Sequence, residues 1–376
     1  MKILVTGANG FIGKNLVKRL ENLGYTDILC FGRENTNEEL KAFCNEADYI
    51  FHLAGVNRPL SEEEFTSGNT GLTRTLTGYL MECKRSCPVV ITSSAQAELD
   101  NPYGISKREA EEAVYEYGQK SKAPVLIYRM PNVFGKWSKP EYNSAVATFC
   151  HNISRGLPIK VNDANHPMTL LYIDDLLDLL TGVMRDHFEG KKIQGSGERL
   201  ADLTCPQYKT TLGHIADTIQ SFPKMRESLE VPDLSDPLVS KLYSTYLSFL
   251  PKDGFAYKLK MNKDVRGSFT EFLRSDDRGQ ISVNITHPGI TKGQHWHDSK
   301  NEKFLVVKGE GLIRFRRIGD SEVTEYHVNG DDLTVVDIPT GYTHSIINEG
   351  EEDLVTLMWA NEAFDPDRPD TYREEV

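Results

Sequence analysis

The chain begins MKILVTGANGFIGKNLVKRL over residues 1–20, where a short apolar run passes through a glycine-rich turn into a periodic apolar segment. Residues 2–5 have the composition of a buried strand, and the apolar side chains of residues 16–23 recur at helical spacing. Glycines in such a turn let the backbone approach a pyrophosphate, which the amides of the helix N-terminus then bind. We therefore predict a dinucleotide-binding turn with these cofactor-binding residues: Gly7, Asn9, Gly10, Phe11, Ile12 and Gly13.

The next two strand-like runs extend this unit along the cofactor. Residues 27–31 lead to Gly32 and Arg33, where a fold that prefers NAD usually carries an acidic residue for the ribose hydroxyls. An arginine there suits a 2′-phosphate, so we predict NADP(H); the alternative is an arginine that is simply solvated. Residues 49–55 form the third run, whose exit is predicted to pass the adenine and ribose. The cofactor-binding residues assigned in this part are Leu53, Ala54, Gly55 and, opening the following helix, Asn69.

A fourth apolar run carries the residue types needed for proton transfer. Residues 89–91 (VVI) lead into Thr92-Ser93-Ser94, and Tyr103 and Lys107 follow four residues apart at the start of a predicted helix, so they share one helix face. A tyrosine has a reference pKa near 10, and a neighbouring cation helps it to exchange a proton near neutral pH. We predict Ser94, Tyr103 and Lys107 as catalytic residues; the alternative is an ordinary surface Tyr–Lys pair.

These motifs together resemble the extended short-chain dehydrogenase/reductase family. The resemblance is carried by TGANGFIG (6–13), HLAG (52–55), TSS (92–94), YGISK (103–107) and RMPNVFG (129–135). It implies a nucleotide-sugar substrate, Tyr103 as general acid, Lys107 lowering its pKa and Ser94 polarising the carbonyl, with Ser93 the second choice. It also implies that Pro131 binds the cofactor. Only eight residues separate Ser94 from Tyr103, fewer than is usual in the family.

The first domain is predicted to span residues 1–245, and the family resemblance places a substrate lobe at about 140–245. Helix-like pieces occur there, for example at residues 173–180 and 212–219. Candidates for contact with the diphosphate of a substrate are Arg155, Lys160 and His166.

Bulk properties limit the remaining possibilities. A length of 376 residues favours two domains, and the net charge of −12 argues against nucleic-acid and anionic-membrane partners. No apolar run approaches the roughly 18 residues of a membrane span, and no signal peptide precedes the first strand, so we expect a cytoplasmic protein. The six cysteines do not have the spacing of a disulfide scaffold, and we expect free thiols.

Beyond residues 251–254 the pattern changes to short alternating runs, which predict an antiparallel β-barrel or sandwich. Within it, alternate residues of a strand put His295 and His297 on one face, Glu302 is expected on an adjoining strand, and His344 on a later turn. Three imidazoles and a carboxylate suit a divalent metal, Zn²⁺, Fe²⁺, Mn²⁺ or Ni²⁺. The alternative is a barrel whose interior histidines are only hydrogen-bonded.

This pattern resembles the two motifs of the cupins over roughly residues 260–365. We therefore predict an α/β Rossmann domain of the extended reductase kind, followed at residues 252–376 by an all-β, metal-binding cupin barrel. Eight residues lie between Gly330 and Pro339, which predicts a hairpin longer than usual before His344. Residues near the cupin motifs that offer acid–base groups, without an assigned role, are Lys292, Lys300, His287, His327 and Tyr342.

The two motif sets in one chain resemble the bifunctional enzymes of bacterial capsular polysaccharide synthesis. The resemblance implies a homodimer in which a zinc cupin epimerises a UDP-2-acetamido-2,6-dideoxy-4-keto-hexose at C3. The Rossmann domain then reduces C4 with NADPH, which gives UDP-2-acetamido-2,6-dideoxy-L-talose. A metal that polarises the C4 carbonyl would promote exchange of the neighbouring C3 proton, so fusion of the two sites is chemically reasonable.

Three other interpretations remain open at the level of the sequence. The cupin could be an oxidative metalloenzyme that shares the chain. It could instead be a noncatalytic binding or dimerisation module beside an NADPH-dependent reductase. Alternatively, the Rossmann domain could be an epimerase or dehydratase that retains its NAD.

Overall fold

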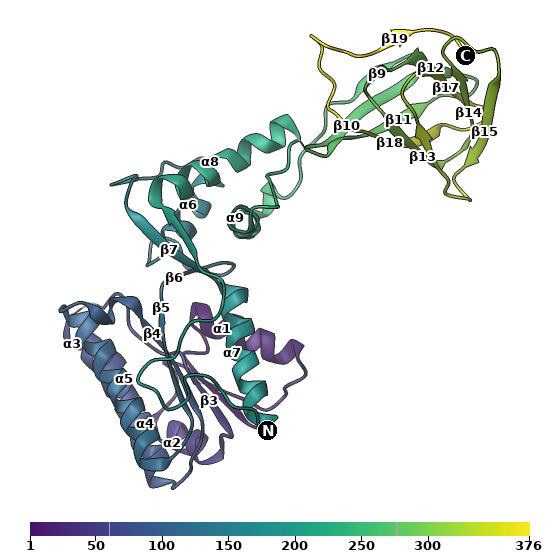
Figure 1. Cartoon of the computed structure of the whole chain (residues 1–376). Coiled ribbons are helices and arrows are strands. Elements are labelled where there is room, and N and C mark those ends of the chain that lie inside the picture. Colours follow the sequence, from purple (N-terminus) through teal and green to yellow (C-terminus); the bar gives the residue numbers. More distant parts are fainter. Residues whose placement is uncertain (60, 276) are drawn as a thin grey trace. The chain divides into compact units, whose positions relative to one another are not determined.

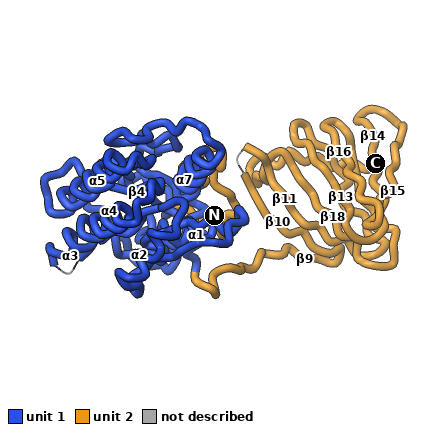
Figure 2. The backbone as a smooth tube through the Cα atoms, turned by 90° about the horizontal axis from the view of Figure 1, so that it is seen from below, with its two compact units in different colours: residues 1–220, 241–250 blue, residues 221–240, 251–376 orange. Residues whose placement is uncertain are grey.

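The computed structural model describes residues 1–59, 61–275 and 277–376 of the chain. It divides into two compact units, residues 1–220 with 241–250 and residues 221–240 with 251–376 (Figure 2). Among the helices in these described ranges, none has the length and apolar character needed to cross a membrane.

The first unit is built on a parallel sheet of five strands in the order β2-β1-β3-β4-β5. Figure 1 labels β3, β4 and β5 of this sheet. Its apolar side chains are buried on both faces, as expected for a parallel sheet covered by helices on both sides. All strands run in one direction, so the turn after β1 and the serines that end β4 lie at the same edge. The strands are β1 (Ile3–Thr6), β2 (Ile28–Phe31), β3 (Tyr49–His52), β4 (Val89–Ser94) and β5 (Val125–Met130).

Helices pack on both faces of this sheet and form two separate cores. The first core joins α1 (Phe11–Asn22) and α7 (Ile173–Phe188) to one face, with Leu16, Leu20 and Leu180 fully buried. The second core joins the other face to helices that contribute Leu40, Leu76 and Val114. These helices are α2 (Asn37–Glu46), α4 (Leu72–Glu82) and α5 (Pro102–Ser121).

A smaller sheet, in the order β6-β7-β8, and several helices complete this part of the chain. Asn69, which we predicted to open a helix, instead lies inside the π-helical segment η1 (Thr66–Gly71), which continues into α4. The remaining elements of the first unit are β6 (Asn132–Phe134), β7 (Pro167–Tyr172), β8 (Tyr208–Thr211), α3 (Glu63–Phe65), η2 (Ala95–Glu98) and α6 (Ala145–Ile153). Two helices, α8 (Leu212–Ser228) and α9 (Pro237–Ser248), have residues in both units, and η3 (Lys252–Gly254) belongs to the second.

The second unit consists of two antiparallel sheets, in the orders β16-β13-β18-β11-β10-β9 and β15-β14-β17-β12-β19. Its apolar core includes Phe304, Ile313, Phe315 and Ile346. The predicted order of an α/β Rossmann domain followed by an all-β domain is confirmed. The strands are β9 (Asn262–Asp264), β10 (Gly267–Ser275), β11 (Gly279–Thr286), β12 (Thr291–Trp296), β13 (Glu302–Lys308), β14 (Glu310–Arg317), β15 (Val323–Asn329), β16 (Val335–Ile338), β17 (Tyr342–Asn348), β18 (Leu354–Ala360) and β19 (Tyr372–Arg373).

Residues 221–240, which the sequence analysis included in the first domain, belong to the second compact unit. The reason is local backbone pairing with β10. The amide of Val231 donates to the carbonyl of Arg274, and the amide of Arg274 donates to the carbonyl of Leu229. The change from helical to alternating sequence pattern therefore does not coincide with the division of the folded chain.

Candidate active site and metal centre

The glycine-rich turn after β1 packs closely against two neighbouring segments. Gly7 has φ +69°, and a Cβ atom there would lie 2.8 Å from the backbone of Ala54. A Cβ on Gly13 would lie 2.1 Å from the carbonyl oxygen of Gly7. Side chains are thus excluded where α1 begins, and the amides at its N-terminus face the turn without a side-chain cap.

The predicted adenosine end of this site is formed by the loop after β2. The side-chain amide nitrogen Nδ2 of Asn9 donates to the carboxylate of Glu34 at 2.7 Å, which connects the turn to the loop that carries the exposed Arg33. Sequence reasoning had not assigned Glu34. The position of Arg33 leaves its guanidinium accessible, and its role with a 2′-phosphate stays a prediction.

Tyr103 lies in the first turn of α5, whose N-terminus is capped by Asn101 and continues with Pro102 at its first position. Its hydroxyl donates to the amide oxygen of Asn57 at 3.0 Å. Burial raises the pKa of Tyr103 above its ordinary value, although a hydrogen bond with Ser94 acts in the opposite direction. The predicted pair Ser94 and Tyr103 is therefore in contact, and Tyr103 is protonated at neutral pH.

Lys107 occupies the same helix face one turn further along and is buried. Its ammonium group donates to the carbonyl of Thr92 at 3.1 Å. A Cβ atom placed on Gly55 would be 3.6 Å from the same nitrogen, so Lys107 lies beside the predicted cofactor segment. Burial lowers the pKa of Lys107 to about 8, and the carboxylate of Glu111 partly opposes this shift.

A buried network supports these residues and was not predicted from the sequence. Glu111, one further turn along α5, accepts from the hydroxyl of Ser93 and from Nε and Nη2 of Arg129 at 3.0 and 2.8 Å. Ser93 is therefore engaged in the framework, whereas Ser94 faces Tyr103. The signal was a glutamate eight residues after the tyrosine, which places it on the same helix face.

The loop after β3 is fixed by Asn69. The side-chain oxygen of Asn69 accepts from the amide of Val56 at 2.8 Å, and its amide group donates to the carbonyl of Val56 at 3.1 Å. This paired contact positions the next residue, Asn57, against Tyr103. Asn57 is a site residue that sequence reasoning missed, because nothing in an isolated asparagine indicates such a contact.

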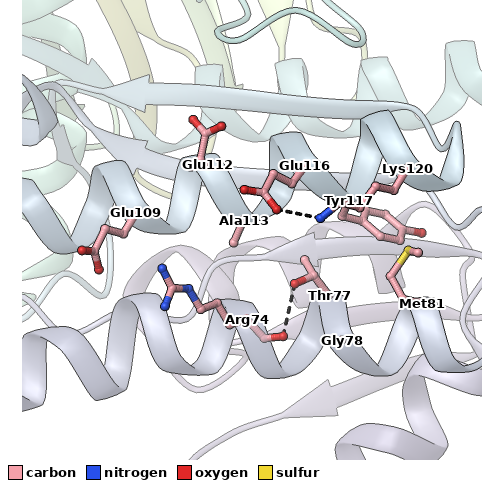
Figure 3. A pocket seen from close by; sticks show the side chains of 10 residues that line it. All are labelled: Arg74, Thr77, Gly78, Met81, Glu109, Glu112, Ala113, Glu116, Tyr117 and Lys120. Carbon is pink, nitrogen blue, oxygen red and sulfur yellow. Dashed lines mark hydrogen bonds and ion pairs between the residues drawn. The ribbon is translucent and has the colours of Figure 1, made fainter.

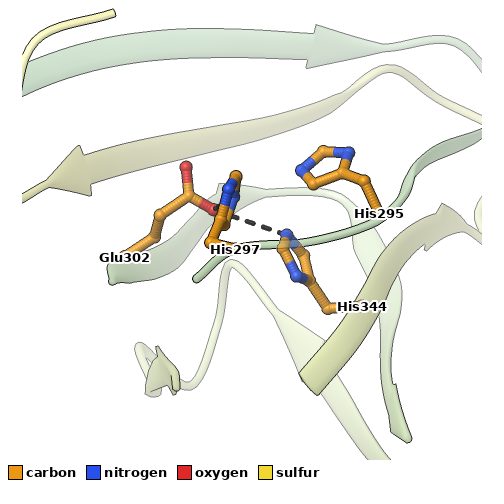
Figure 4. A group of neighbouring side chains, drawn as sticks. All are labelled: His295, His297, Glu302 and His344. Carbon is orange, nitrogen blue, oxygen red and sulfur yellow. Dashed lines mark ion pairs between the residues drawn. The ribbon is translucent and has the colours of Figure 1, made fainter. Parts of the chain in front are cut away.

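In the second unit the four predicted metal ligands converge (Figure 4). Ligand atoms of His295, His297, Glu302 and His344 all lie within 4.8 Å of one another. Nε2 of His297 is 3.5 Å, and Nε2 of His344 is 3.4 Å, from Oε2 of Glu302. The cluster is enclosed, since His297 and His344 are almost completely buried.

The elements that supply these ligands differ in two respects from the prediction. His344 lies within strand β17 and not on a turn, directly opposite His295 of β12. Glu302 begins β13, which belongs to the other sheet and pairs with β16 and β18. A register shift between Gly293 and His295 separates the ligand-bearing end of β12 from its regular part. Alternation along one strand could not reveal this geometry across two sheets.

Four ligand atoms in this cluster are buried without any hydrogen-bond partner: Nε2 of His297, Oε2 of Glu302, and Nδ1 and Nε2 of His344. Burial lowers the pKa of His295 to about 4. Burial alone would raise the pKa of Glu302, but the nearby imidazoles of His297 and His344 outweigh burial and the pKa falls to about 2. Although burial opposes it, contacts with Glu302 and with the carbonyl of Asp370 raise the pKa of His297. An ionised carboxylate and imidazoles that have given up any extra proton are the forms that bind metal ions.

Several secondary candidates are held elsewhere. Arg155 donates to the carbonyls of His151 and Phe249, so its guanidinium is engaged within the lobe. Lys292 donates to the side chain of Asn284 and to the carbonyl of Ile285, both at 2.7 Å. Two further acid–base candidates, His287 and His327, contact Asp353 and Glu349. Lys300 donates to the carbonyl of Pro369 but lies close enough to His297 to act on its pKa.

A groove of about 370 Å³ lies on the outer surface of α4 and α5 (Figure 3). None of the predicted catalytic or cofactor-binding residues lines it. Three carboxylates face it from α5, with two basic side chains among its other lining residues. The groove is lined by Arg74, Thr77, Gly78, Met81, Glu109, Glu112, Ala113, Glu116, Tyr117 and Lys120.

The Rossmann fold with its glycine turn and Tyr–Lys helix defines a class of nucleotide-cofactor protein, and the chain belongs to the NAD dependent epimerase/dehydratase family, whose model matches residues 3–194. Residues 262–372 match the polysaccharide biosynthesis C-terminal domain. The predicted resemblance to the capsular polysaccharide enzymes is confirmed by full-length relatives.

One relative is the UDP-2-acetamido-2,6-beta-L-arabino-hexul-4-ose reductase of Pseudomonas aeruginosa, which is 46% identical over 99% of this chain and 98% of its own length. The crystal structure of the capsular polysaccharide assembling protein CapF from Staphylococcus aureus superimposes with a TM-score of 0.92 at 48% identity, covering 100% of both chains. The spore coat polysaccharide biosynthesis protein SpsL of Bacillus subtilis is 26% identical over 31% of this chain and 83% of its own length.

Proposed function

We propose that this chain is a bifunctional nucleotide-sugar enzyme, in which the second unit epimerises C3 of a UDP-2-acetamido-2,6-dideoxy-4-keto-hexose and the first unit reduces C4. The observation that carries the proposal is the presence in one chain of a Ser–Tyr–Lys site and a buried three-histidine, one-glutamate cluster. It is supported by a full-length relative whose name states reduction of such a UDP-sugar. The proposed product is UDP-2-acetamido-2,6-dideoxy-L-talose.

In the reduction, Tyr103 acts as the general acid. Its raised pKa keeps the hydroxyl protonated at neutral pH, so it can give that proton to the C4 oxygen as the carbonyl becomes an alcohol. Ser94, which contacts Tyr103, donates a hydrogen bond to the same oxygen. Lys107, with a pKa of about 8, carries a charge near neutral pH and favours the tyrosinate left behind.

The first unit fits a nicotinamide cofactor, which supplies the hydride for C4 when bound. The backbone around Gly7 and Gly13 leaves no room for side chains beside the start of α1. Such a turn allows a pyrophosphate to approach the backbone closely. Arg33 is exposed at the end of β2 and would bind a 2′-phosphate, so the proposed cofactor is NADPH.

The cluster in the second unit fits a divalent metal, which we propose is zinc and which supplies Lewis-acid polarisation of a carbonyl when bound. His295, His297, Glu302 and His344 would hold it. The fit rests on the buried ligand atoms that have no protein partner, and on a donor set of three nitrogens and one oxygen. Such an environment suits exchange of the C3 proton, which is acidified by the neighbouring carbonyl.

A homodimer is proposed through the outer face of the six-stranded sheet. Val283, Leu357, Leu305 and Val335 are aligned across four adjacent strands, on the face opposite Glu302. This row is apolar and partly exposed, as expected of a surface covered by a second copy. The groove on α4 and α5 suits this role less well, because two copies would bring its carboxylates together.

The test is an assay of the full chain with the 4-keto UDP-sugar in D₂O, following deuterium at C3 with and without NADPH. We expect deuterium at C3 without NADPH, retained in Tyr103→Phe and lost in His295→Ala. With substrate already epimerised at C3, NADPH oxidation should be lost in Tyr103→Phe and retained in His295→Ala.

Matched controls are Tyr115→Phe, which alters another tyrosine of α5, and His287→Ala, which alters a histidine paired with Asp353 outside the cluster. Both should behave as the unaltered chain. NADPH oxidation without any deuterium at C3 would refute the epimerase and leave a reductase with a noncatalytic metal module.

A further inference from the structure

The end of the chain forms a strap, residues 365–376, along the strand that carries His295. Within it, β19 pairs with β12, with Arg373 opposite His295 and Tyr372 opposite Trp296. The rings of Tyr372 and Trp296 stack with their centroids 4.7 Å apart. The amide of Glu374 donates to the carbonyl of Gln294, which extends this pairing beyond the strand. The strap thus covers an edge of the sheet that would otherwise be free.

Asp370 of the strap organises the turn between β12 and β13. Its carboxylate accepts from three consecutive backbone amides, those of Asp298, Ser299 and Lys300, at 2.9, 3.0 and 2.7 Å. The hydroxyl of Ser299 donates to it at 3.1 Å as well. This short turn joins His297 to Glu302, so one carboxylate fixes the segment that ends in two proposed ligands.

The backbone of the same residue fixes the ring of His297. The carbonyl oxygen of Asp370 is hydrogen-bonded to Nδ1 of His297. A carbonyl can only accept, so Nδ1 must carry the proton and Nε2 of the neutral ring presents its lone pair. That Nε2 atom faces Glu302 and has no hydrogen-bond partner. The contact therefore sets both the tautomer and the orientation that a metal ligand needs.

The conformation of Asp370 indicates that these contacts are not incidental. Its φ is +38°, in the left-handed region that only a few per cent of non-glycine residues adopt, with Asp and Asn among the better tolerated. A residue stays in such a conformation where surrounding contacts require it. Here the left-handed backbone presents carbonyl and carboxylate toward the same turn.

We propose that Asp370 is a positioning residue of the metal centre, which holds His297 as the Nδ1–H tautomer and fixes the turn between His297 and Glu302. The inference rests on the proposed metal site and extends it to the end of the chain, a segment whose role no sequence motif indicated. The strap acts through His297, without contributing a ligand of its own.

The test is the affinity of the full chain for Zn²⁺, measured by competition with a chelator in Asp370→Gly. Glycine tolerates the positive φ, so this variant removes the carboxylate without adding backbone strain. We expect Zn²⁺ binding weakened roughly 10- to 100-fold, the usual effect of losing an outer contact to a ligand. Asp370→Asn, which keeps one side-chain oxygen, should be intermediate. Asp365→Gly is the matched control, because the contacts of Asp365 with the described residues are to its neighbours Asp367 and Arg368 in the strap.

Nitrogen-15 NMR of the histidine rings supplies a readout independent of activity. In the metal-free chain we expect His297, assigned with His297→Gln, to be the Nδ1–H tautomer. Asp370→Gly keeps the carbonyl but removes the carboxylate contacts that hold it against Nδ1, so we expect a mixture of tautomers there. Equal Zn²⁺ affinity in Asp370→Gly and Asp365→Gly, while the unaltered chain binds Zn²⁺, would overturn this inference and leave the metal site intact. An unaltered chain that binds no Zn²⁺ would refute the metal site itself and the inference with it.

Discussion

The two candidate sites differ in how their buried polar atoms are paired. Around the Tyr–Lys helix, both ring nitrogens of His52 contact threonine hydroxyls and Glu111 accepts from Ser93 and Arg129. In the second unit, Nε2 of His297, Oε2 of Glu302 and both nitrogens of His344 are buried without a hydrogen-bond partner. Unpaired buried polar atoms are costly, so the first framework is complete by itself, whereas the proposed metal ion would supply the missing partners in the second.

The largest expected effect comes from removing the hydroxyl of Tyr103 while the hydrogen bonds around the Tyr–Lys helix stay intact. Tyr103→Phe deletes the hydroxyl that contacts Asn57, and loss of a general acid usually costs roughly 10²- to 10⁴-fold in rate. We expect reduction of the 4-keto sugar to fall by about this factor. Steady-state kinetics of the full chain measures it, and Zn²⁺ content should not change. A variant that loses Zn²⁺ as well would contradict the separation of the two sites.

Metal removal tests the cluster in the second unit, whose buried ligand atoms have no hydrogen-bond partner. A ligand that binds only the folded state at about 100 times its Kd stabilises that state by roughly 2.7 kcal/mol. We expect Zn²⁺ to slow hydrogen exchange in β12, β13 and β17, which carry or adjoin His295, Glu302 and His344, and to leave β1 and β3 unchanged. Hydrogen exchange with mass spectrometry, before and after chelation, checks this. Equal protection from hydrogen exchange with and without Zn²⁺ would show that burial of these unpaired atoms does not destabilise the metal-free fold.

The different outcomes of sequence reasoning for the two sites have the same physical origin. Gly7, Tyr103 and Lys107 could be found because local spacing determines which residues share a turn or helix face. The four metal ligands could be named from their chemistry, but their elements could not all be placed. Glu302 and His344 come from different sheets, and strand pairing over long sequence distances is not encoded in alternation.

Contacts made by ordinary polar residues could not be predicted at all. Asn57 touches Tyr103 only because Asn69 fixes the loop before it, and Asp370 reaches His297 across 73 positions of sequence. The boundary between the units could not be predicted either. Residues 229–231 join β10 through backbone hydrogen bonds, which do not depend on the identity of the side chains. Local patterns therefore gave the candidate reacting groups, and the residues that contact them emerged only from the fold.

Low pH tests the stability of the hydrogen-bonded framework in the first unit, which contains the buried His52. Burial, followed by the charge of Lys107, lowers the pKa of His52 from 6.5 to about 3. As pH falls below about 6.5 the unfolded chain binds a proton that the folded one refuses, so stability is present above that pH and is lost down to about pH 3. The loss is roughly 2 kcal/mol at pH 5.

The measurement is urea-dependent hydrogen exchange of β1 and β3 at pH 7 and pH 5. His52→Asn keeps polar atoms for Thr6 and Thr73 but cannot titrate, so its stability difference between the two pH values should be smaller by about 2 kcal/mol. An unchanged difference would mean that His52 accepts its proton without unfolding.

The smallest expected effect is the difference between Ser93→Ala and Ser94→Ala. It tests which of these two hydroxyls belongs to the hydrogen-bonded framework around the Tyr–Lys helix. Ser93 donates to the buried carboxylate of Glu111, which keeps Arg129 as a partner, so Ser93→Ala should lower the free energy of unfolding by about 1 kcal/mol and leave the kcat of reduction nearly unchanged. Ser94→Ala should mainly lower the kcat, because Ser94 contacts Tyr103 and is proposed to donate to the substrate oxygen. Its hydroxyl also accepts an exposed hydrogen bond from the amide of Gln96, so some loss of stability should accompany the loss of rate. Urea unfolding and steady-state kinetics on both variants form a crossed comparison. If Ser93→Ala lowers the rate and Ser94→Ala the stability, the two roles are exchanged, and the hydroxyl that donates to Glu111 in this structure is the one that binds substrate.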